Sequence, residues 1–145
     1  MTAGRMYYVG SFVAENNITF TRIGIRVTTG TSSGGDTAIL GVYTSSGGLP
    51  VNLVGTNSAE VAIDANADVE ATVSIPLVAG RRYWVVINCE AAVTLASFAG
   101  TNNVRDSSSS VAPDSTTTII KDTVAYASTL PATSAAAAGD YVAES

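Results

Sequence analysis

Oxygen-bearing side chains alternate along one short segment of the chain, at Asp64, Asn66, Asp68 and Glu70. Calcium takes six to eight oxygen ligands in proteins, and loops of the D-x-N-x-D type supply them from alternate positions. Such loops also carry glycine at the sixth position and glutamate at the twelfth, where this chain has Val69 and Ile75. The segment is a weak calcium candidate, and we favour the alternative of a polar turn whose side chains bond their own backbone.

Nucleophilic and acid–base chemistry has few candidates in this chain. The sequence of 145 residues contains no histidine and one cysteine, Cys89. Without histidine, neither a Ser-His-Asp nor a Cys-His nucleophile can be assembled, and one thiol is too few for a Cys/His zinc site. The twelve carboxylates are spread over expected turns and outward strand faces. The sequence predicts no catalytic residue, no cofactor and no enzymatic activity.

Trp84 and Cys89, in and just after one apolar run, each have a functional and a structural interpretation. Trp84 is a ring that could stack on a sugar, but it stands in residues 83–87 (YWVVI), where burial in a core is the favoured interpretation. We expect Tyr83 and Trp84 to face opposite sides of one central strand. Cys89 follows the same run and is expected to be a small buried hydrophobe.

The composition limits the kinds of partner. Charged residues make up 13% of the chain, about half the usual share of about 25%, so we expect a surface partly covered by neighbouring proteins. The net charge is −5 and the seven basic residues are scattered, whereas nucleic-acid binding needs a basic stripe. No apolar run approaches about 18 residues, so no membrane insertion is expected. The first ten residues lack the apolar region of a signal peptide, which favours synthesis in a cytoplasm.

Alternating apolar patterns predict an all-β protein, an antiparallel β-sandwich resembling a jelly roll with about eight to ten strands. The turns between the strands are rich in Gly and Ser, and residues 45–50 (SSGGLP) are expected to form one of them. Residues 37–44 and 81–88 are apolar on both faces, which predicts central strands. Strands are expected at residues 6–13, 18–29, 37–44, 53–54, 59–63, 69–77, 81–88, 93–98 and 116–129.

Apolar side chains change face within residues 18–29. Ile18 and Phe20 share one face of the expected strand, whereas the apolar side chains of residues 23–27 share the other. A one-residue change of this kind predicts a β-bulge or bend, which we place at residues 21–22.

The chain is expected to form one sandwich domain over residues 1–130, followed by an extended C-terminal arm over residues 131–145. The arm contains Pro131 and an alanine run, and it shows too little periodicity for an element of its own. We expect it to lie on its own sheet or on a neighbouring subunit. Tyr141 and Val142 are its apolar anchors and the predicted interaction residues.

Three stretches in a fixed order resemble a known β-sandwich module. They are residues 5–10 (RMYYVG), then 22–25 (RIGI) leading to 40–50 (with LGVY and GLP), and residues 77–84 (LVAGRRYW). Their order is similar to that in a module of tailed-bacteriophage virion proteins, found in tail fibres and small head proteins. The resemblance covers about residues 5–100 and implies a phage structural protein, with no defined ligand or active site.

The resemblance and the composition lead to two expected functions. The first is a non-enzymatic capsid decoration (cement) protein, bound to the major capsid protein on the outer surface of the virion head. The alternative is a tail-fibre or receptor-binding module that recognises a host surface glycan or protein. In either case we expect a homotrimer, because such proteins gather at three-fold positions and closed symmetry leaves no open interface.

Overall fold

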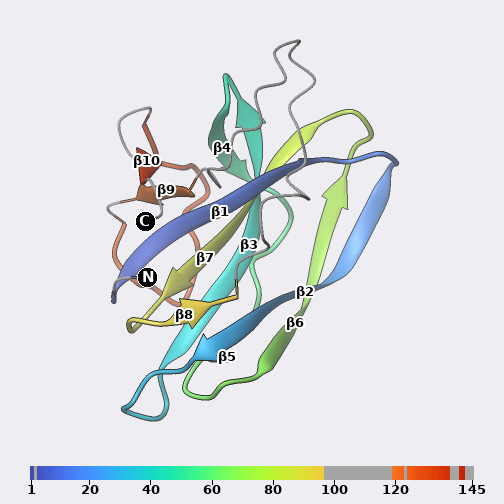
Figure 1. The fold of residues 1–145 in the computed structure, drawn as a ribbon. Helices are drawn as coiled ribbons and strands as arrows, with labels where there is room; N and C mark the ends of the chain where they lie inside the picture. The colour runs from blue at the N-terminus through green and yellow to red at the C-terminus, as the bar shows by residue number, and fades with distance from the viewer. Residues whose placement is uncertain (2, 97–118, 123, 138–140, 143–145) are drawn as a thin grey trace.

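The computed structural model describes residues 1, 3–96, 119–122, 124–137 and 141–142 (Figure 1). These residues form strands and irregular segments and contain no helix, and every strand pair is antiparallel. The strands are β1 (Arg5–Val13), β2 (Ile18–Thr29), β3 (Thr37–Ser46), β4 (Leu49–Leu53), β5 (Val61–Ala62), β6 (Asp68–Leu77), β7 (Arg82–Cys89), β8 (Thr94–Leu95), β9 (Ile119–Asp122) and β10 (Tyr141–Val142). The prediction of an all-β antiparallel sandwich is confirmed.

Two sheets form the sandwich. The large sheet has the order β10-β9-β1-β7-β3-β4, with β5 paired to the beginning of β3, and the small sheet has the order β6-β2-β8. The chain crosses between the sheets several times, and two of these crossings, the β1–β2 and β6–β7 connections, lie side by side at one end of the molecule (Figure 1). The expected jelly-roll connectivity stays a prediction.

The space between the sheets is filled from both sides by apolar side chains. The small sheet contributes the inward row of β6, in which every second residue from Ala71 to Leu77 is buried. The large sheet contributes side chains such as Tyr7, Leu40 and Ile87. Apolar and polar residues alternate along β6 because one face of this strand packs against the core and the other face lies in solvent.

The other face of the large sheet is buried as well. Residues 124–137, here called the C-terminal strap, lie over a cluster that includes Tyr8, Tyr43 and Trp84. The strap pairs with β4, since the Leu53 N–H donates to the Ala132 carbonyl at 2.9 Å and the Ser134 N–H donates to the Val51 carbonyl at 2.7 Å. Burial on both faces explains why β3 and β7 are apolar on both sides.

Most expected strands agree with the structure, and the bulge is confirmed. The bounds of β2 are those predicted, and its register against β6 shifts between Phe20 and Arg22. The turn expected over residues 45–50 is present but shorter, because β3 continues to Ser46 and β4 begins at Leu49. Only Gly47 and Gly48 form the turn, with φ values of 59° and 82° that glycine adopts without strain.

The last expected strand, over residues 116–129, is confirmed in part. Its residues 119–122 form β9, whereas residues 124–129 leave the ladder and begin the strap. Residues 116–118 and 97–98, the latter at the end of the expected strand 93–98, lie outside the described residues. The strap brings residues 131–137 of the predicted arm onto the chain's own sheet.

Candidate interaction surface

Tyr83 and Trp84 occupy opposite faces of β7, as predicted. Tyr83 is 2% exposed and packs in the core between the sheets, whereas Trp84 is 4% exposed and packs under the C-terminal strap. The Trp84 indole donates its Nε1 hydrogen to Ser45 Oγ at 3.2 Å. The ring therefore has its polar group satisfied and no open face on which a sugar could stack.

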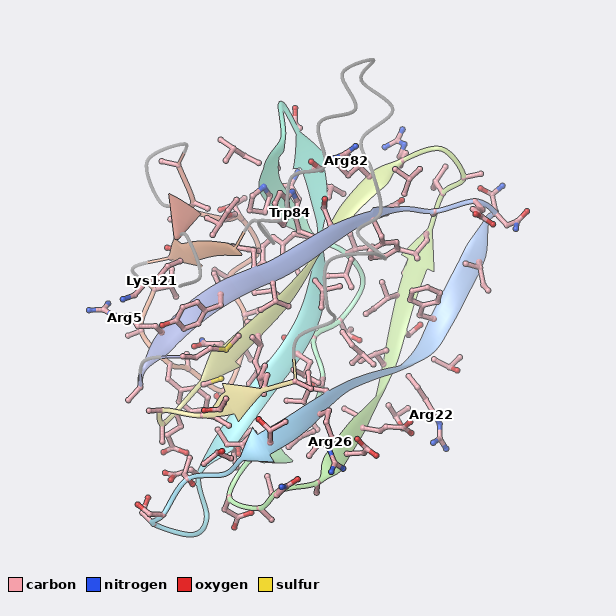
Figure 2. All side chains as sticks on the ribbon, viewed as in Figure 1. Arg5, Arg22, Arg26, Arg82, Trp84 and Lys121 are labelled. Atoms are coloured by element: carbon pink, nitrogen blue, oxygen red, sulfur yellow. The ribbon has the colours of Figure 1, made fainter. Side chains whose placement is uncertain are left out.

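Arginines on β2 contact three of the four calcium candidates. Arg26 contacts Asn66 Oδ1 at 3.1 Å and Asp68 Oδ1 at 3.3 Å, and Arg22 contacts Glu70 Oε2 at 2.7 Å. Arg22 and Arg26 project from β2 away from the large sheet (Figure 2), because they stand on the outer face of the small sheet beside β6.

The fourth candidate, Asp64, accepts a hydrogen bond from the Gly35 N–H at 3.2 Å. Asp68 and Glu70 therefore pair with arginines of the neighbouring strand on an exposed face, where an ion pair contributes about 0–1 kcal/mol. Within the described ranges, no three His, Cys, Asp or Glu side chains gather in a way that could hold a metal ion.

Cys89 is buried at the end of β7 and is a free thiol. Burial raises the pKa of this thiol to about 12, because the thiolate would lose its hydration. The expectation of a buried, hydrophobe-like cysteine is confirmed.

A group of polar side chains lies beneath the C-terminal strap and fixes its position. The Tyr8 hydroxyl donates to Ser134 Oγ at 2.7 Å, and the Tyr43 hydroxyl donates to the Pro131 carbonyl. The two rings meet edge to face, with centroids 5.4 Å apart. Burial raises the pKa of both hydroxyls, because the phenolate form would be poorly solvated there. Both tyrosines therefore hold the strap as neutral donors.

The predicted anchors Tyr141 and Val142 form β10, at the edge of the large sheet. Tyr141 pairs with Ile120 and Val142 with Ile119. The arm is thus joined to the sheet through its backbone at this point. The anchoring role of the two side chains stays a prediction.

The exposed large apolar side chains of the described residues all lie at one end of the sandwich. They are Val13 (37% exposed), Ile18 (51%), Phe20 (37%) and Val78 (48%), and we call them the apolar end. They stand on or next to the β1–β2 and β6–β7 connections. Ile18 and Phe20 face the space between the sheets, whereas Val13, which pairs with Arg82, faces the outer side of the large sheet. The four side chains therefore share one end of the molecule without sharing one face, and each is available for contact there.

Backbone hydrogen bonds tie the two connections into one unit. The Ala14 N–H donates to the Arg81 carbonyl at 3.0 Å, and the Gly80 N–H donates to the Ala14 carbonyl at 2.8 Å. The Ala79 N–H donates to Asn17 Oδ1 at 2.8 Å. The apolar end is therefore held in a fixed shape before any partner arrives, which lowers the ordering cost of binding.

An aromatic stack supports the apolar end from inside. Phe20 stacks on Phe12, with ring centroids 6.1 Å apart, and Phe12 contacts Tyr83 at 5.8 Å. Ile18 and Phe20 lie opposite the buried Leu77 and Ile75 on β6, so they share the inward face of the small sheet. They remain exposed because this part of the face is not fully covered.

Two charged side chains of opposite sign flank the apolar end. Glu15 belongs to the β1–β2 connection and Arg81 to the β6–β7 connection, and both are exposed. Among the residues that the structure describes, neither takes part in an ion pair, although their backbones are adjacent through Ala14.

Sequence reasoning did not find the apolar end. Two signals were available: Val78 is a β-branched residue within a tight connection, and Ile18 and Phe20 stand before the change of face in β2. Neither signal shows how far the opposite sheet extends, and the extent of that sheet determines whether these side chains are exposed. Comparison with known protein families, curated proteins and solved structures found no match to the chain.

Proposed function

We propose that the chain is a non-enzymatic structural protein of a tailed-bacteriophage virion, a decoration protein bound to the major capsid protein on the outer surface of the head. The observation that carries the proposal is the apolar end, where Val78 stands in the β6–β7 connection and the other exposed apolar side chains stand in β1 and β2 near the β1–β2 connection. A preformed apolar surface of this kind suits contact with another protein. The phage assignment rests on the ordered stretches in residues 5–100.

The character of the surface supports a protein partner over a nucleic acid. Two of the basic residues, Arg22 and Arg26, are paired with carboxylates on β6, so their charge is compensated within the chain. Binding to phosphates would require free cations along one face. The described residues contain no helix that is long and apolar enough to cross a membrane.

We propose a homotrimer as the working assembly. Only 13% of the residues are charged, so much of the surface can be buried against neighbouring copies without removing charges from water. A closed ring of three copies would place three sandwiches around one axis on the head.

A tail-fibre or receptor-binding module is the second candidate, because the ordered stretches also resemble fibre proteins. Its ligand would be a host surface glycan or protein. The buried Trp84 ring argues against stacking of a sugar at that residue.

Cryo-electron microscopy of the parent virion distinguishes the two candidates. The proposal expects density for this sandwich in many copies over the head, in contact with the major capsid protein. Density confined to the tail would reject the decoration function and favour the fibre module.

Binding to purified heads that lack the protein tests whether the apolar end makes the contact. We expect the double variant Phe20→Ser/Val78→Ser to bind heads at least about tenfold more weakly than the unchanged protein, through lost apolar burial. The matched control is Thr72→Ser, an exposed position on the outer face of β6, which should bind normally. Equal binding by all three proteins would show that the apolar end does not contact the head.

A further inference from the structure

We infer that residues 124–126, the first part of the C-terminal strap, form a gate that opens on its own and admits water to Asn88 and Asp122 while the rest of the fold stays closed. The inference is independent of the proposed function. It rests on polar atoms buried without partners under the gate, on the few contacts that close the gate, and on the firmer attachment of the next part of the strap.

Two polar side chains under the gate are only partly satisfied. Asn88 is 0% exposed, and its Nδ2 donates to the Ala125 carbonyl at 3.3 Å. Asp122 is 1% exposed, and its Oδ1 accepts from the Val124 N–H at 3.2 Å. The second polar atom of each side chain, Asn88 Oδ1 or Asp122 Oδ2, is buried and has no hydrogen-bond partner among the described residues. A buried acceptor without a donor costs free energy, and the cost is larger for a carboxylate than for an amide.

The basic side chains of the two nearest strands face away from the gate. Asn88 and Asp122 both stand opposite Met6, one on each side of β1. Arg5 precedes Met6 in β1, and Lys121 precedes Asp122 in β9. Successive side chains of a strand point to opposite faces, so both cations belong to the face toward the small sheet. The face under the gate thus carries an acidic side chain without a basic one from either strand.

The Tyr8 hydroxyl does not fill the need for a donor. It lies near Asp122, but its single hydrogen is donated to Ser134 Oγ at 2.7 Å. Tyr8 therefore holds the later part of the strap and leaves Asp122 Oδ2 unpartnered.

The gate itself is closed by few contacts. Val124 and Tyr126 are half-buried against the cluster on the outer face of the large sheet, and Ala125 is exposed. The Tyr126 hydroxyl bonds Thr37 Oγ1 at 2.6 Å and Glu60 Oε1 at 3.1 Å. Glu60 is exposed and Thr37 is half-buried, so water can replace these bonds at small cost. Tyr126 acts as the latch of the gate.

The next part of the strap is attached more firmly. Leu130 is buried, and residues 131–134 accept or donate hydrogen bonds to Tyr8, Tyr43 and the backbone of β4. Residues 127–129, between the two parts, are all exposed. The gate can therefore swing about residues 127–129 while the later part stays in place.

Opening of the gate gives up little apolar burial and brings water to both unpartnered oxygens. Such segments open at a lower free energy than the whole fold. Met6, which is 0% exposed and stands between Asn88 and Asp122, becomes accessible in the open state. The oxidation of its thioether therefore reports the opening.

Oxidation of the full chain by hydrogen peroxide, followed by mass spectrometry of the peptides, tests the inference. We expect Met6 to oxidise faster than global unfolding allows, in proportion to the open fraction. Asp122→Asn keeps an acceptor for Val124 and removes the unpartnered carboxylate, so it should slow the oxidation about tenfold. Tyr126→Phe removes the latch and should speed it about three- to tenfold.

Three controls separate the gate from general stability. The oxidation rate of Met1, the other methionine of the chain, should be the same in all proteins. Hydrogen exchange of the Ser134 N–H, which donates to Val51 outside the gate, should be unchanged in both variants. Glu15→Gln is the matched control for the loss of a carboxylate, because Glu15 is exposed at the other end of the sandwich, and it should not change the oxidation of Met6.

Each contrary result overturns the inference in a different way. Oxidation of Met6 only at the rate of global unfolding would show that the gate does not open on its own. Faster oxidation in Asp122→Asn would show that the carboxylate is satisfied in solution, by water or by a bound cation, and holds the gate closed. Equal acceleration of Ser134 exchange and Met6 oxidation in Tyr126→Phe would show that the strap opens as one piece.

Discussion

Leu130 of the C-terminal strap occupies the space that a side chain at Gly41 would need. A Cβ atom added to Gly41 would stand 2.5 Å from Leu130 Cδ1, closer than real Cβ contacts allow. Gly41 lies in the middle of β3, and Leu130 is buried in the cluster on the outer face of the large sheet. The strap and the sheet thus meet at a point where the sheet has no side chain, which lets the strap approach the backbone.

We expect Gly41→Ala to destabilise the protein by about 1–3 kcal/mol, the usual cost of over-packing a core. The value should fall at the lower end, because the obstructing atom is the end of a leucine side chain and can shift by rotation. Urea unfolding followed by tryptophan fluorescence measures the change, with Trp84 as a reporter in the same cluster.

Gly10→Ala is the matched control, since a Cβ atom at Gly10 would meet nothing within 4 Å. Its free energy of unfolding should stay within about 0.5 kcal/mol of the unchanged protein. In Gly41→Ala/Leu130→Ala the loss should be smaller than the sum of the single losses, because the new methyl group fills space that Leu130 leaves. Strict additivity would show that the two positions do not touch.

Trp84→Ala should cost about 3–5 kcal/mol of stability, through lost transfer free energy and the cavity left behind. Its ring is buried under the strap, and Ser45 would lose the indole donor. Trp84→Phe, which keeps an aromatic ring in the cluster, should lose less. An unchanged melting temperature together with lost binding to cells or sugar would contradict the core position and favour a lectin.

Stability should fall as the pH rises above about 10. Tyr8 and Tyr43 have pKa values raised above the ordinary value of 10.0 by burial, so the folded chain keeps protons that the unfolded chain releases. Their contribution is therefore complete below pH 10 and is lost progressively above it. Each tyrosine can add a slope of up to about 1.4 kcal/mol per pH unit. Urea unfolding between pH 8 and pH 11 records it.

Tyr8→Phe and Tyr43→Phe are the variants for this effect. Each loses a hydrogen bond to the strap, so its stability at pH 8 should drop by about 1 kcal/mol, while its decline above pH 10 should be shallower. Cys89 contributes a further decline that begins near pH 9.0 in every variant. Parallel curves for all three proteins would show that neither tyrosine is responsible.

Deletion of residues 131–145 should leave the sandwich folded while weakening its attachment to the virion or the oligomer. The described residues among those deleted, 131–137 and 141–142, take no part in the core between the sheets. The deletion removes the acceptors of Tyr8 and Tyr43 and the pairing of the strap with β4, so some stability should also be lost. Circular dichroism and attachment assays measure the two effects. The variant Tyr141→Ala/Val142→Ala tests the predicted anchors alone. Normal attachment of this variant and of the deletion variant would show that the arm has no role in attachment.

Sequence patterns predicted the strands that obey a local rule. β2 and its bulge were found because the apolar side chains from Ile18 to Val27 change face once, and the spacing of the apolar residues in the sequence shows that change. β6 was found from its unbroken alternation. The central position of β3 and β7 followed from apolar residues on both faces, although the cover on the outer face turned out to be the strap.

Local patterns failed where the structure depends on distant residues. Residues 124–129 carry β-forming side chains, yet they leave the ladder because Tyr126 reaches Thr37 at 2.6 Å and the Ala125 carbonyl accepts from Asn88 at 3.3 Å. The apolar end escaped notice for a similar reason. Whether Phe20 is covered depends on where the opposite sheet ends, which no feature near Phe20 in the sequence records.

The position of the strap also sets a time order for folding. A ribosome makes the strands that carry Met6, Tyr43 and Trp84 long before it makes residues 124–137, which cover these side chains. Until residues 119–137 have emerged, one face of the large sheet is apolar and open, and β1 lacks its neighbour β9. Exposed apolar faces and unpaired edges are what make incomplete chains prone to aggregation. The large sheet is therefore covered on both faces only after residues 124–137 have been made, and a chain released before that point would expose the cluster around Trp84 to other chains.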